Sequence, residues 1–148
     1  MKRAPISILL LTCFVSTIAA HATLPSVRFG DMARKATCVV LAQPLKSIST
    51  DEYEFLALAV ASETRCDNSR FVVRRASNES LAAFATTPYL LFLNKLEGNT
   101  YSYTAEAFGA LPVSNGIVST TVFMEMPEKT PLETVMALVQ RERAKRQP

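Results

Sequence analysis

Residues 88–103 (PYLLFLNKLEGNTYSY) constrain the fold of this chain most, because they combine its densest apolar run outside the N-terminus with a clear turn signal. The dipeptide Gly98-Asn99 lies between two runs of β-forming residues. Tight hairpin turns favour such residues because their backbone adopts positive φ. The stretch therefore predicts an antiparallel hairpin with a two-residue turn.

The alternation of side chains along a strand assigns a face to each residue of this hairpin once Glu97 is paired with Thr100. On the side of the hairpin that faces away from the predicted core, the first strand carries Leu91 and Leu93 but the second strand carries polar residues, so we expect only partial burial there. The first strand is then central and the second lies nearer an edge. The predicted core side holds Leu90, Phe92, Asn94, Leu96, Tyr101 and Tyr103.

Further strands are predicted where β-branched and apolar residues cluster, at residues 37–48, 52–61 and 71–75. Pro44 predicts an edge position or a bulge within the first of them. A second turn dipeptide, Asn115-Gly116, predicts a hairpin in which Val113 faces Val118.

Three helices are predicted, two of them short: residues 29–36, where the periodicity is weak, and residues 78–84, where Asn78 is a good N-cap. The third is C-terminal, over residues 130–146, because Thr130-Pro131-Leu132-Glu133 matches a capping box with proline at the first helical position. An apolar stripe indicates that this helix docks on the sheet. The stripe consists of Leu132, Val135, Met136 and Val139.

The N-terminus has the three parts of a secretory signal peptide. Residues 1–3 are positively charged, residues 4–18 are almost wholly apolar, and Ala20-His21-Ala22 is a small-x-small cleavage site. The apolar run is shorter than the ~20 residues that a membrane-spanning helix requires. We expect cleavage after Ala22 and export to the periplasm or the exterior.

Two alternatives to this processing remain open. Cys13 resembles a bacterial lipoprotein cysteine that would anchor the protein to a membrane, although Thr12 departs from the small residue expected before it. Cleavage after Ala20 instead would leave His21 at the mature N-terminus, where its imidazole and the free amine suit a transition metal.

Removing 22 of the 148 residues leaves 126, the size of one ordinary domain with a single core. The formal charge of +3 falls to about +1 once Lys2 and Arg3 are removed. This balance gives no electrostatic reason to expect nucleic acid or an acidic membrane as the partner. The mature chain has no predicted transmembrane segment, and the sequence leaves its oligomeric state open.

The mature chain keeps two cysteines, Cys38 and Cys66, which in an exported protein most simply form one disulfide. Closing a loop of this length contributes roughly 3–4 kcal/mol in the chain-entropy model. A redox pair or a metal site is the alternative, but the chain has no CxxC motif, and its only histidine, His21, leaves with the signal peptide.

The composition excludes several chemistries. Without a histidine the mature chain cannot build a triad with a histidine base or a histidine-ligated zinc site, and it has no phosphate-binding glycine motif, so we expect no cofactor and no metal. Two acids on one strand face, Glu52 and Glu54, leave a carboxylate-based enzyme as an alternative function.

Two clusters of basic residues each have two interpretations. Arg70, Arg74 and Arg75 surround Phe71 and suggest either an oligonucleotide-binding strand face or a charged edge that discourages aggregation. The end of the C-terminal helix suggests either a patch for an anionic surface or a solvated terminus whose cations suit the helix dipole. This second cluster consists of Arg141, Arg143, Lys145 and Arg146.

The order strand, strand, strand, short helix, strand, strand is that of the five-stranded OB barrel. Three segments, ATCVVLAQPL, PYLLFLNKLEGNTYSYTAEAFGALPVSNGIV and PLETVMALVQ, resemble bacterial exported domains of unknown function that are distantly similar to netrin-like and metalloproteinase-inhibitor OB barrels. The resemblance implies a mainly β (α+β) fold, a small OB-like antiparallel barrel with a short helix before its fourth strand and a C-terminal helix packed on it. Such inhibitors chelate zinc through an N-terminal cysteine, whereas this chain would begin at Thr23.

These observations predict an exported, non-catalytic binding module, inhibitor-like or an accessory subunit, whose partner is an unknown protein or peptide. Its interaction surface is expected at an exposed aromatic patch near Tyr101, Tyr103 and Phe108. The alternatives are the carboxylate-based enzyme, which requires two convergent acids in a cleft, and an oligonucleotide-binding OB domain. The latter requires Arg70, Arg74 and Arg75 to share one exposed face.

Overall fold

The computed structural model describes residues 27–61, 64–75 and 86–145. The predicted signal peptide, the predicted helix at residues 78–84 and Arg146 lie outside these described residues. Two α-helices, α1 (Phe29–Lys35) and α2 (Leu132–Ala144), and a 3-10 turn, η1 (Glu106–Gly109), accompany the strands. The strands are β1 (Cys38–Ser47), β2 (Glu52–Val60), β3 (Arg70–Arg74), β4 (Tyr89–Glu97), β5 (Thr100–Tyr103), β6 (Ala110–Ser114), β7 (Ile117–Ser119) and β8 (Lys129–Pro131).

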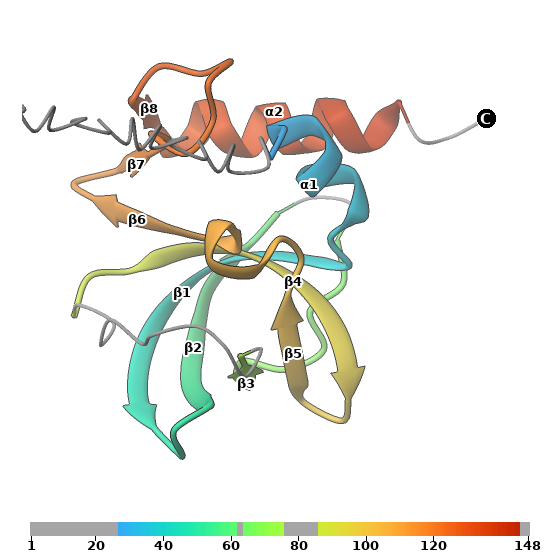
Figure 1. Ribbon diagram of the computed structural model, residues 1–148, viewed down its shortest axis with the longest axis vertical. Coiled ribbons are helices and arrows are strands. Elements are labelled where there is room, and N and C mark those ends of the chain that lie inside the picture. Colours follow the sequence, from blue (N-terminus) through green and yellow to red (C-terminus); the bar gives the residue numbers. More distant parts are fainter. Residues whose placement is uncertain (1–26, 62–63, 76–85, 146–148) are drawn as a thin grey trace, which may run out of the picture.

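Five strands close into a barrel in the order β1-β2-β3-β5-β4, with β4 pairing back onto β1 (Figure 1). The β3–β5 pair is parallel and the other four pairs are antiparallel. This architecture confirms the predicted OB-like barrel. Within the barrel every strand has a neighbour on each side, and the sheet continues from β4 into β6, β7 and β8.

The β4–β5 hairpin forms at Gly98, which has a φ of 51°, but the predicted register is wrong beyond the first pair. Glu97 does pair with Thr100, yet an irregularity at Leu96 shifts the ladder so that Tyr101 faces Lys95. A one-residue bulge exchanges the faces of all residues beyond it. Leu96 is consequently 48% exposed, and the Tyr101 ring turns into the barrel.

Residues 90–93 of strand β4 are buried on both faces, which corrects the expected partial burial of the second face there. Leu91 and Leu93 point into the barrel, while Leu90 and Phe92 point outward beneath other elements. The strand is central, as predicted, since it pairs with β1, β5 and β6. Its hairpin partner β5 is not an edge strand, because β5 also pairs with β3.

The barrel interior is a cluster of aliphatic and aromatic side chains from all five strands. Its centre is an aromatic group in which Phe71 stacks on Phe55 with ring centroids 5.9 Å apart and meets Tyr101 edge-on at 5.6 Å. Such pairs contribute beyond the burial of their area. The buried members are Cys38, Val40, Ala42, Phe55, Phe71, Val73, Leu91, Leu93 and Tyr101.

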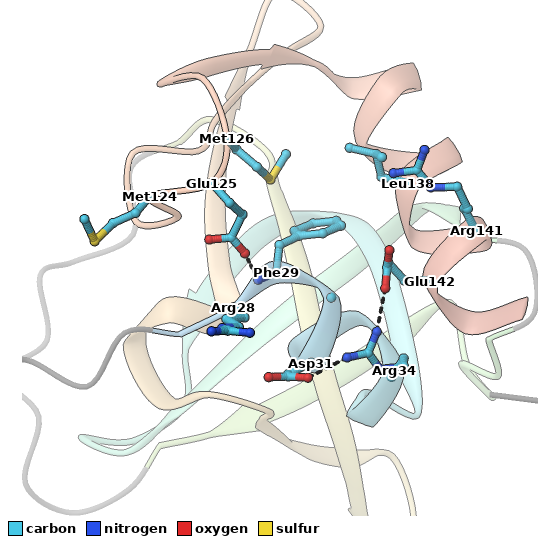
Figure 2. A pocket seen from close by; sticks show the side chains of 11 residues that line it. Arg28, Phe29, Asp31, Arg34, Met124, Glu125, Met126, Leu138, Arg141 and Glu142 are labelled. Carbon is cyan, nitrogen blue, oxygen red and sulfur yellow. Dashed lines mark hydrogen bonds and ion pairs between the residues drawn. The ribbon is translucent and has the colours of Figure 1, made fainter. Parts of the chain in front are cut away.

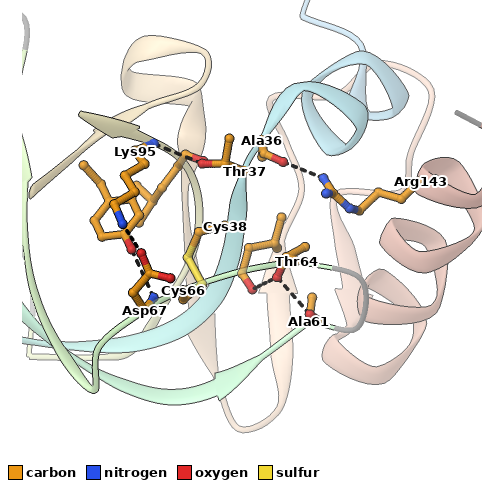
Figure 3. Close-up of a disulfide and its surroundings, with 12 residues drawn as sticks. Ala36, Thr37, Cys38, Ala61, Thr64, Cys66, Asp67, Lys95 and Arg143 are labelled. Carbon is orange, nitrogen blue, oxygen red and sulfur yellow. Dashed lines mark hydrogen bonds and ion pairs between the residues drawn. A yellow bond between two sulfur atoms is a disulfide. The ribbon is translucent and has the colours of Figure 1, made fainter. Parts of the chain in front are cut away.

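The predicted disulfide is present between Cys38, at the start of β1, and Cys66, in the connection from β2 to β3 (Figure 3). The two Cα atoms are 5.2 Å apart, within the range of ordinary disulfides. The same connection is held by the backbone N–H of Asp67, which donates to the Tyr101 hydroxyl at 3.2 Å, and by an ion pair between Asp67 and Lys95. The disulfide therefore fastens a loop over one end of the barrel.

A second core lies outside the barrel, between the outer face of β1 and β4 and a cover made of α1, α2 and β6–β8 (Figure 1). Phe29 of α1 is at its centre and meets Phe92 and Phe123 edge-on, with ring centroids 5.8 Å and 5.4 Å apart. The predicted stripe of α2 enters this core, where Val135 and Val139 are fully buried.

The start of α2 differs from the predicted capping box. Thr130 belongs to β8, where it pairs with Val118, and its hydroxyl bonds that of Thr120 at 3.1 Å. The N-cap is Pro131, and no side chain caps the helix. Thr130 is therefore part of a strand pair, whereas the local sequence pattern had assigned it to the start of the helix. The β6–β7 hairpin itself forms as predicted, with Val113 opposite Val118.

The end of α1 is held by a side chain from α2. The guanidinium of Arg143 donates from one nitrogen to the carbonyl oxygens of Ala33 at 3.0 Å and Ala36 at 2.5 Å. A cation at a helix C-terminus satisfies exposed carbonyls and the negative end of the helix dipole. Neither helix of the described residues is long and apolar enough to cross a membrane.

Candidate functional site

A cleft of about 730 Å³ lies between α1, α2 and the loop of residues 120–128 that joins β7 to β8 (Figure 2). We call it the α1–α2 cleft. Phe29 and Met126 line it on one side and Leu138 of α2 on the other. Its volume is within the range of pockets that accommodate ligands or the side chains of a partner.

The loop that forms one wall of the α1–α2 cleft is anchored at its middle and its base. Phe123 is buried in the outer core, and the Thr120 hydroxyl bonds the carbonyl of Pro127 across the loop. Between these anchors Met124 projects outward and is 93% exposed. Exposed methionines adapt to varied apolar contacts, which suits a binding surface.

The carboxylates of the cleft and Arg34 are engaged in ion pairs or hydrogen bonds. Arg34 bonds Glu142 and Asp31, each at 2.5 Å, and so joins α1 to α2. Glu142 also accepts from Lys145 at 2.6 Å, and the Glu125 carboxylate accepts the backbone N–H of Phe29 at 2.7 Å. The loop, α1 and α2 are therefore fastened together by their charges around the apolar lining.

Glu142 is 9% exposed, which is unusual for a carboxylate. The pKa of Glu142 is lowered, first by the hydrogen bond from Lys145; burial acts in the opposite direction, and the charges of Lys145, Arg34 and Arg141 lower the pKa further. Gly30 makes the close approach of this carboxylate feasible, because a Cβ there would lie 2.8 Å from Glu142 Oε2.

Two cations of the cleft have no carboxylate partner among the described residues. Arg28 precedes α1 and Arg141 lies on α2, and both are exposed. Unlike Arg34, neither forms an ion pair within the described parts of the chain. Their guanidinium groups are therefore available to an acidic ligand.

The predicted aromatic surface is not assembled as one patch. Tyr101 is 1% exposed inside the barrel, so it is not available to a partner; the hairpin pattern, which placed it on the core side, agrees better with the structure than its assignment to the surface. Tyr103 and Phe108 are half-buried. Gly109 packs closely against Tyr103: a Cβ atom added to this glycine would lie 3.1 Å from the Cβ of the tyrosine.

The three arginines of the oligonucleotide alternative do not share one face. Arg70 and Arg74 alternate with buried Phe71 on the outer side of β3, whereas Arg75 follows the strand and is half-buried. Arg74 already bonds Glu52 at 2.9 Å. The condition for an oligonucleotide-binding face is not met.

The two acids of the enzyme alternative lie on the outer face of β2 and do not converge in a cleft. Glu52 bonds Arg74, and Glu54 lies 3.7 Å from Lys46. Both therefore belong to surface ion pairs between neighbouring strands. Among the described residues no group of three or more histidine, cysteine or acidic side chains is placed to hold a metal ion.

Sequence reasoning missed the α1–α2 cleft, because its walls come from segments without a strong local pattern. One signal was available in the C-terminal helix. Glu142 continues the stripe of Val135 and Val139 at the i+7 position, which places a carboxylate on the buried face. A charge in such a position requires a partner from another element.

Comparison of the chain with protein-family models, with curated proteins and with solved structures finds no match in any of the three. The resemblance to netrin-like domains therefore stays a prediction from the sequence. The function has to be argued from the geometry of this chain alone.

Proposed function

We propose that this protein is an exported, non-catalytic binding module that holds a segment of a protein or peptide partner in the α1–α2 cleft. The observation that carries the proposal is the combination, in one open cleft, of an apolar lining, an exposed methionine and two arginines that form no ion pair with the described residues. Apolar contacts at the centre and charged groups at the rim are typical of surfaces that bind proteins.

Export is supported by the signal-peptide pattern of residues 1–22 and by the disulfide. Disulfides persist in oxidising compartments such as the periplasm and are rare in the cytosol. Expression with the native N-terminus in a Gram-negative bacterial host checks this part. We expect a periplasmic protein whose first residue is Thr23, whereas lipid attached to Cys13 or retention in the cytosol would contradict it.

A binding role fits the acids of the cleft better than catalysis. A general acid requires a carboxyl group whose pKa is raised towards neutral pH. In Glu142 the pKa is lowered, and its oxygens are held by Arg34 and Lys145. Asp31 is engaged with Arg34 and Glu125 with the backbone, so these carboxylates hold the cleft together.

A random-peptide library selected against the oxidised mature protein tests the proposal. Selected peptides are then measured against two variants, Met124→Ala and Arg141→Glu, and against Arg70→Glu as a control on the far side of the barrel. These residues are exposed, so all three variants should keep the fold.

We expect each cleft variant to weaken binding by about tenfold, the effect of losing one important interface residue, and the control to leave it unchanged. Thermal unfolding of each variant verifies that folding is intact. Failure to enrich any peptide, or peptides that bind the cleft variants as tightly as the wild type, would overturn the proposed site.

A further inference from the structure

The two cysteines of the disulfide lie in very different surroundings (Figure 3). Cys38 is the first residue of β1, where it pairs with Leu93 of β4, and it is 1% exposed. Cys66 lies outside the strands, in the connection from β2 to β3, and is half-buried between exposed Arg65 and Asp67. An outward movement of this connection alone therefore brings Cys66 to solvent, whereas Cys38 stays packed among the barrel strands.

Hydrogen bonds hold the connection on both sides of Cys66 without the help of the disulfide. The backbone N–H of Arg65 donates to the Thr37 carbonyl at 3.0 Å, and that of Asp67 donates to the Tyr101 hydroxyl at 3.2 Å. Thr37 directly precedes β1, and the Tyr101 ring is buried in the barrel. Both acceptors are positioned by the barrel itself, so its folding is sufficient to bring the two thiols together.

The barrel also has sources of stability other than the disulfide. Five paired strands enclose the interior cluster, and the outer core covers β1 and β4. A disulfide that closes a loop of this length contributes a part of the stability typical of a small domain and not the whole of it. The reduced chain therefore keeps the interactions that it needs to fold.

Packing around Cys38 leaves no room for a reagent attached to it. Its side chain belongs to the buried interior cluster together with Val40, Leu93 and Tyr101. Protein interiors are close-packed, and an added group forces strain on the side chains around it. A mixed disulfide is therefore accommodated on Cys66, on the outer side of the connection, and not on Cys38.

We propose that the barrel folds before its disulfide forms, and that Cys66 is the cysteine through which an external disulfide oxidises the folded protein. The oxidant is a disulfide of the oxidising compartment to which the chain is exported. The inference does not depend on what the α1–α2 cleft binds.

Oxidation then proceeds by two thiol–disulfide exchanges. In the first, the Cys66 thiolate attacks one sulfur of the external disulfide, so that a mixed disulfide forms and the other sulfur leaves as a thiolate. In the second, the Cys38 thiolate attacks Cys66 Sγ from the barrel interior, which forms the Cys38–Cys66 bond and releases the second external thiolate to solvent. The protons of the two cysteine thiols pass to the two released thiolates, and two electrons pass from the protein to the external disulfide.

Denaturant unfolding of the reduced mature protein tests the order of folding and oxidation. We expect one cooperative transition, at a lower denaturant concentration than for the oxidised protein. Without denaturant, amide exchange in β1 and β4 should be slow in the reduced protein. A reduced protein with no cooperative transition and no protected amides would overturn the proposal.

Two single-cysteine variants, Cys38→Ala and Cys66→Ala, test which sulfur exchanges. Each is incubated with oxidised glutathione, and mass spectrometry follows the mixed disulfide. In the folded state we expect the Cys38→Ala protein to react at least about tenfold faster than the Cys66→Ala protein, because a local opening exposes its remaining thiol. In denaturant the two rates should agree within about twofold, which is the matched control. Equal rates in the folded state, or faster reaction of the Cys66→Ala protein, would contradict the assignment.

The reduced wild type gives the same information without a substitution. Acid quenching early in its oxidation by oxidised glutathione traps the mixed disulfide, and peptide mapping by mass spectrometry locates it. Glutathione attached to Cys66 supports the proposal, and glutathione attached to Cys38 refutes it.

Tyr101→Phe tests whether hydrogen bonds position Cys66 for the second exchange. The substitution keeps the ring and removes the acceptor of the Asp67 N–H, so the trapped mixed disulfide should convert to the Cys38–Cys66 bond about two- to fivefold more slowly. Tyr53→Phe removes a hydroxyl at the opposite end of the barrel and should leave this rate unchanged. An unchanged rate in the Tyr101→Phe protein would show that the connection is not positioned by the barrel before oxidation.

Discussion

The barrel interior and the outer core share strand β4 but are held together differently. The interior is enclosed by a continuous ring of backbone hydrogen bonds and fastened by the Cys38–Cys66 disulfide. The outer core is covered by two helices and three short strands, joined by side-chain contacts such as those of Arg34 and Arg143.

This difference explains where a binding surface arises. Strands in a barrel are spaced by their hydrogen bonds, so the interior fills with side chains and leaves no opening. Helices and loops meet at angles that leave hollows between them. The α1–α2 cleft lies beside α1, at such a junction.

The largest expected effect comes from removing an aromatic ring from each core. Phe71→Ala in the barrel should destabilise the protein by about 3–5 kcal/mol, a large share of a small domain's stability. Because the outer core rests on the barrel, we expect protection from amide exchange to fall throughout the chain. The matched variant Phe123→Ala should instead lower protection in α1 and α2 and spare the barrel strands. If the two variants gave the same pattern of amide exchange, the barrel interior and the outer core would not differ in the way described.

Removal of the disulfide tests the fastening of the barrel. Replacing Cys38 and Cys66 by alanine should lower the free energy of unfolding by roughly 3–4 kcal/mol, because the unfolded chain gains the freedom of an open 28-residue loop. Denaturant titration measures the change. A reductant should destabilise the wild type by a similar amount and have no effect on the double variant. Equal stability of the oxidised wild type and the double variant would refute the role of the disulfide.

Arg143→Met tests the side-chain fastening of the outer core. The substitution keeps the length of the side chain but leaves the carbonyls of Ala33 and Ala36 without their donor, which should cost about 1–2 kcal/mol. Amide exchange should accelerate in α1 and stay unchanged in β2 and β3. Arg141→Met, on the exposed side of the same helix, is the control. Faster exchange in the barrel strands would show that the two cores are not separable.

The smallest effect is the pH dependence that Glu142 contributes. Its pKa in the folded protein is lowered from the ordinary 4.5, so its ion pairs stabilise the fold fully above that value, and the contribution is lost as the pH falls through the folded pKa. Unfolding free energies of the wild type and Glu142→Gln, measured from neutral to acidic pH, should therefore converge at low pH. A constant difference across this range would contradict the assignment.

Local patterns predicted most of the elements. The β-forming residues in 52–61 and the turn dipeptides at Gly98 and Asn115 specify strands and hairpins over short distances, and both turns have positive φ. The bulge at Leu96 was not predicted by the turn residues, which fix only the first pair of the hairpin; β5 also pairs with β3, a strand outside the hairpin. Thr130 was likewise assigned to the wrong element, since its strand pairing lies outside the local pattern.

The positions of most strands along the chain, the pairing of Cys38 with Cys66 and the apolar stripe of α2 could be predicted from residue types and their periodicity. The ion pair of Arg34 with Glu142 and the contact of Phe29 with Phe123 could not, because they depend on how distant elements pack together. The residues of the α1–α2 cleft are separated by about a hundred positions, as for Phe29 and Glu125 with their 2.7 Å hydrogen bond. Contacts between residues so far apart in the sequence form only when the elements that carry the residues pack together. No local sequence pattern specifies how those elements pack.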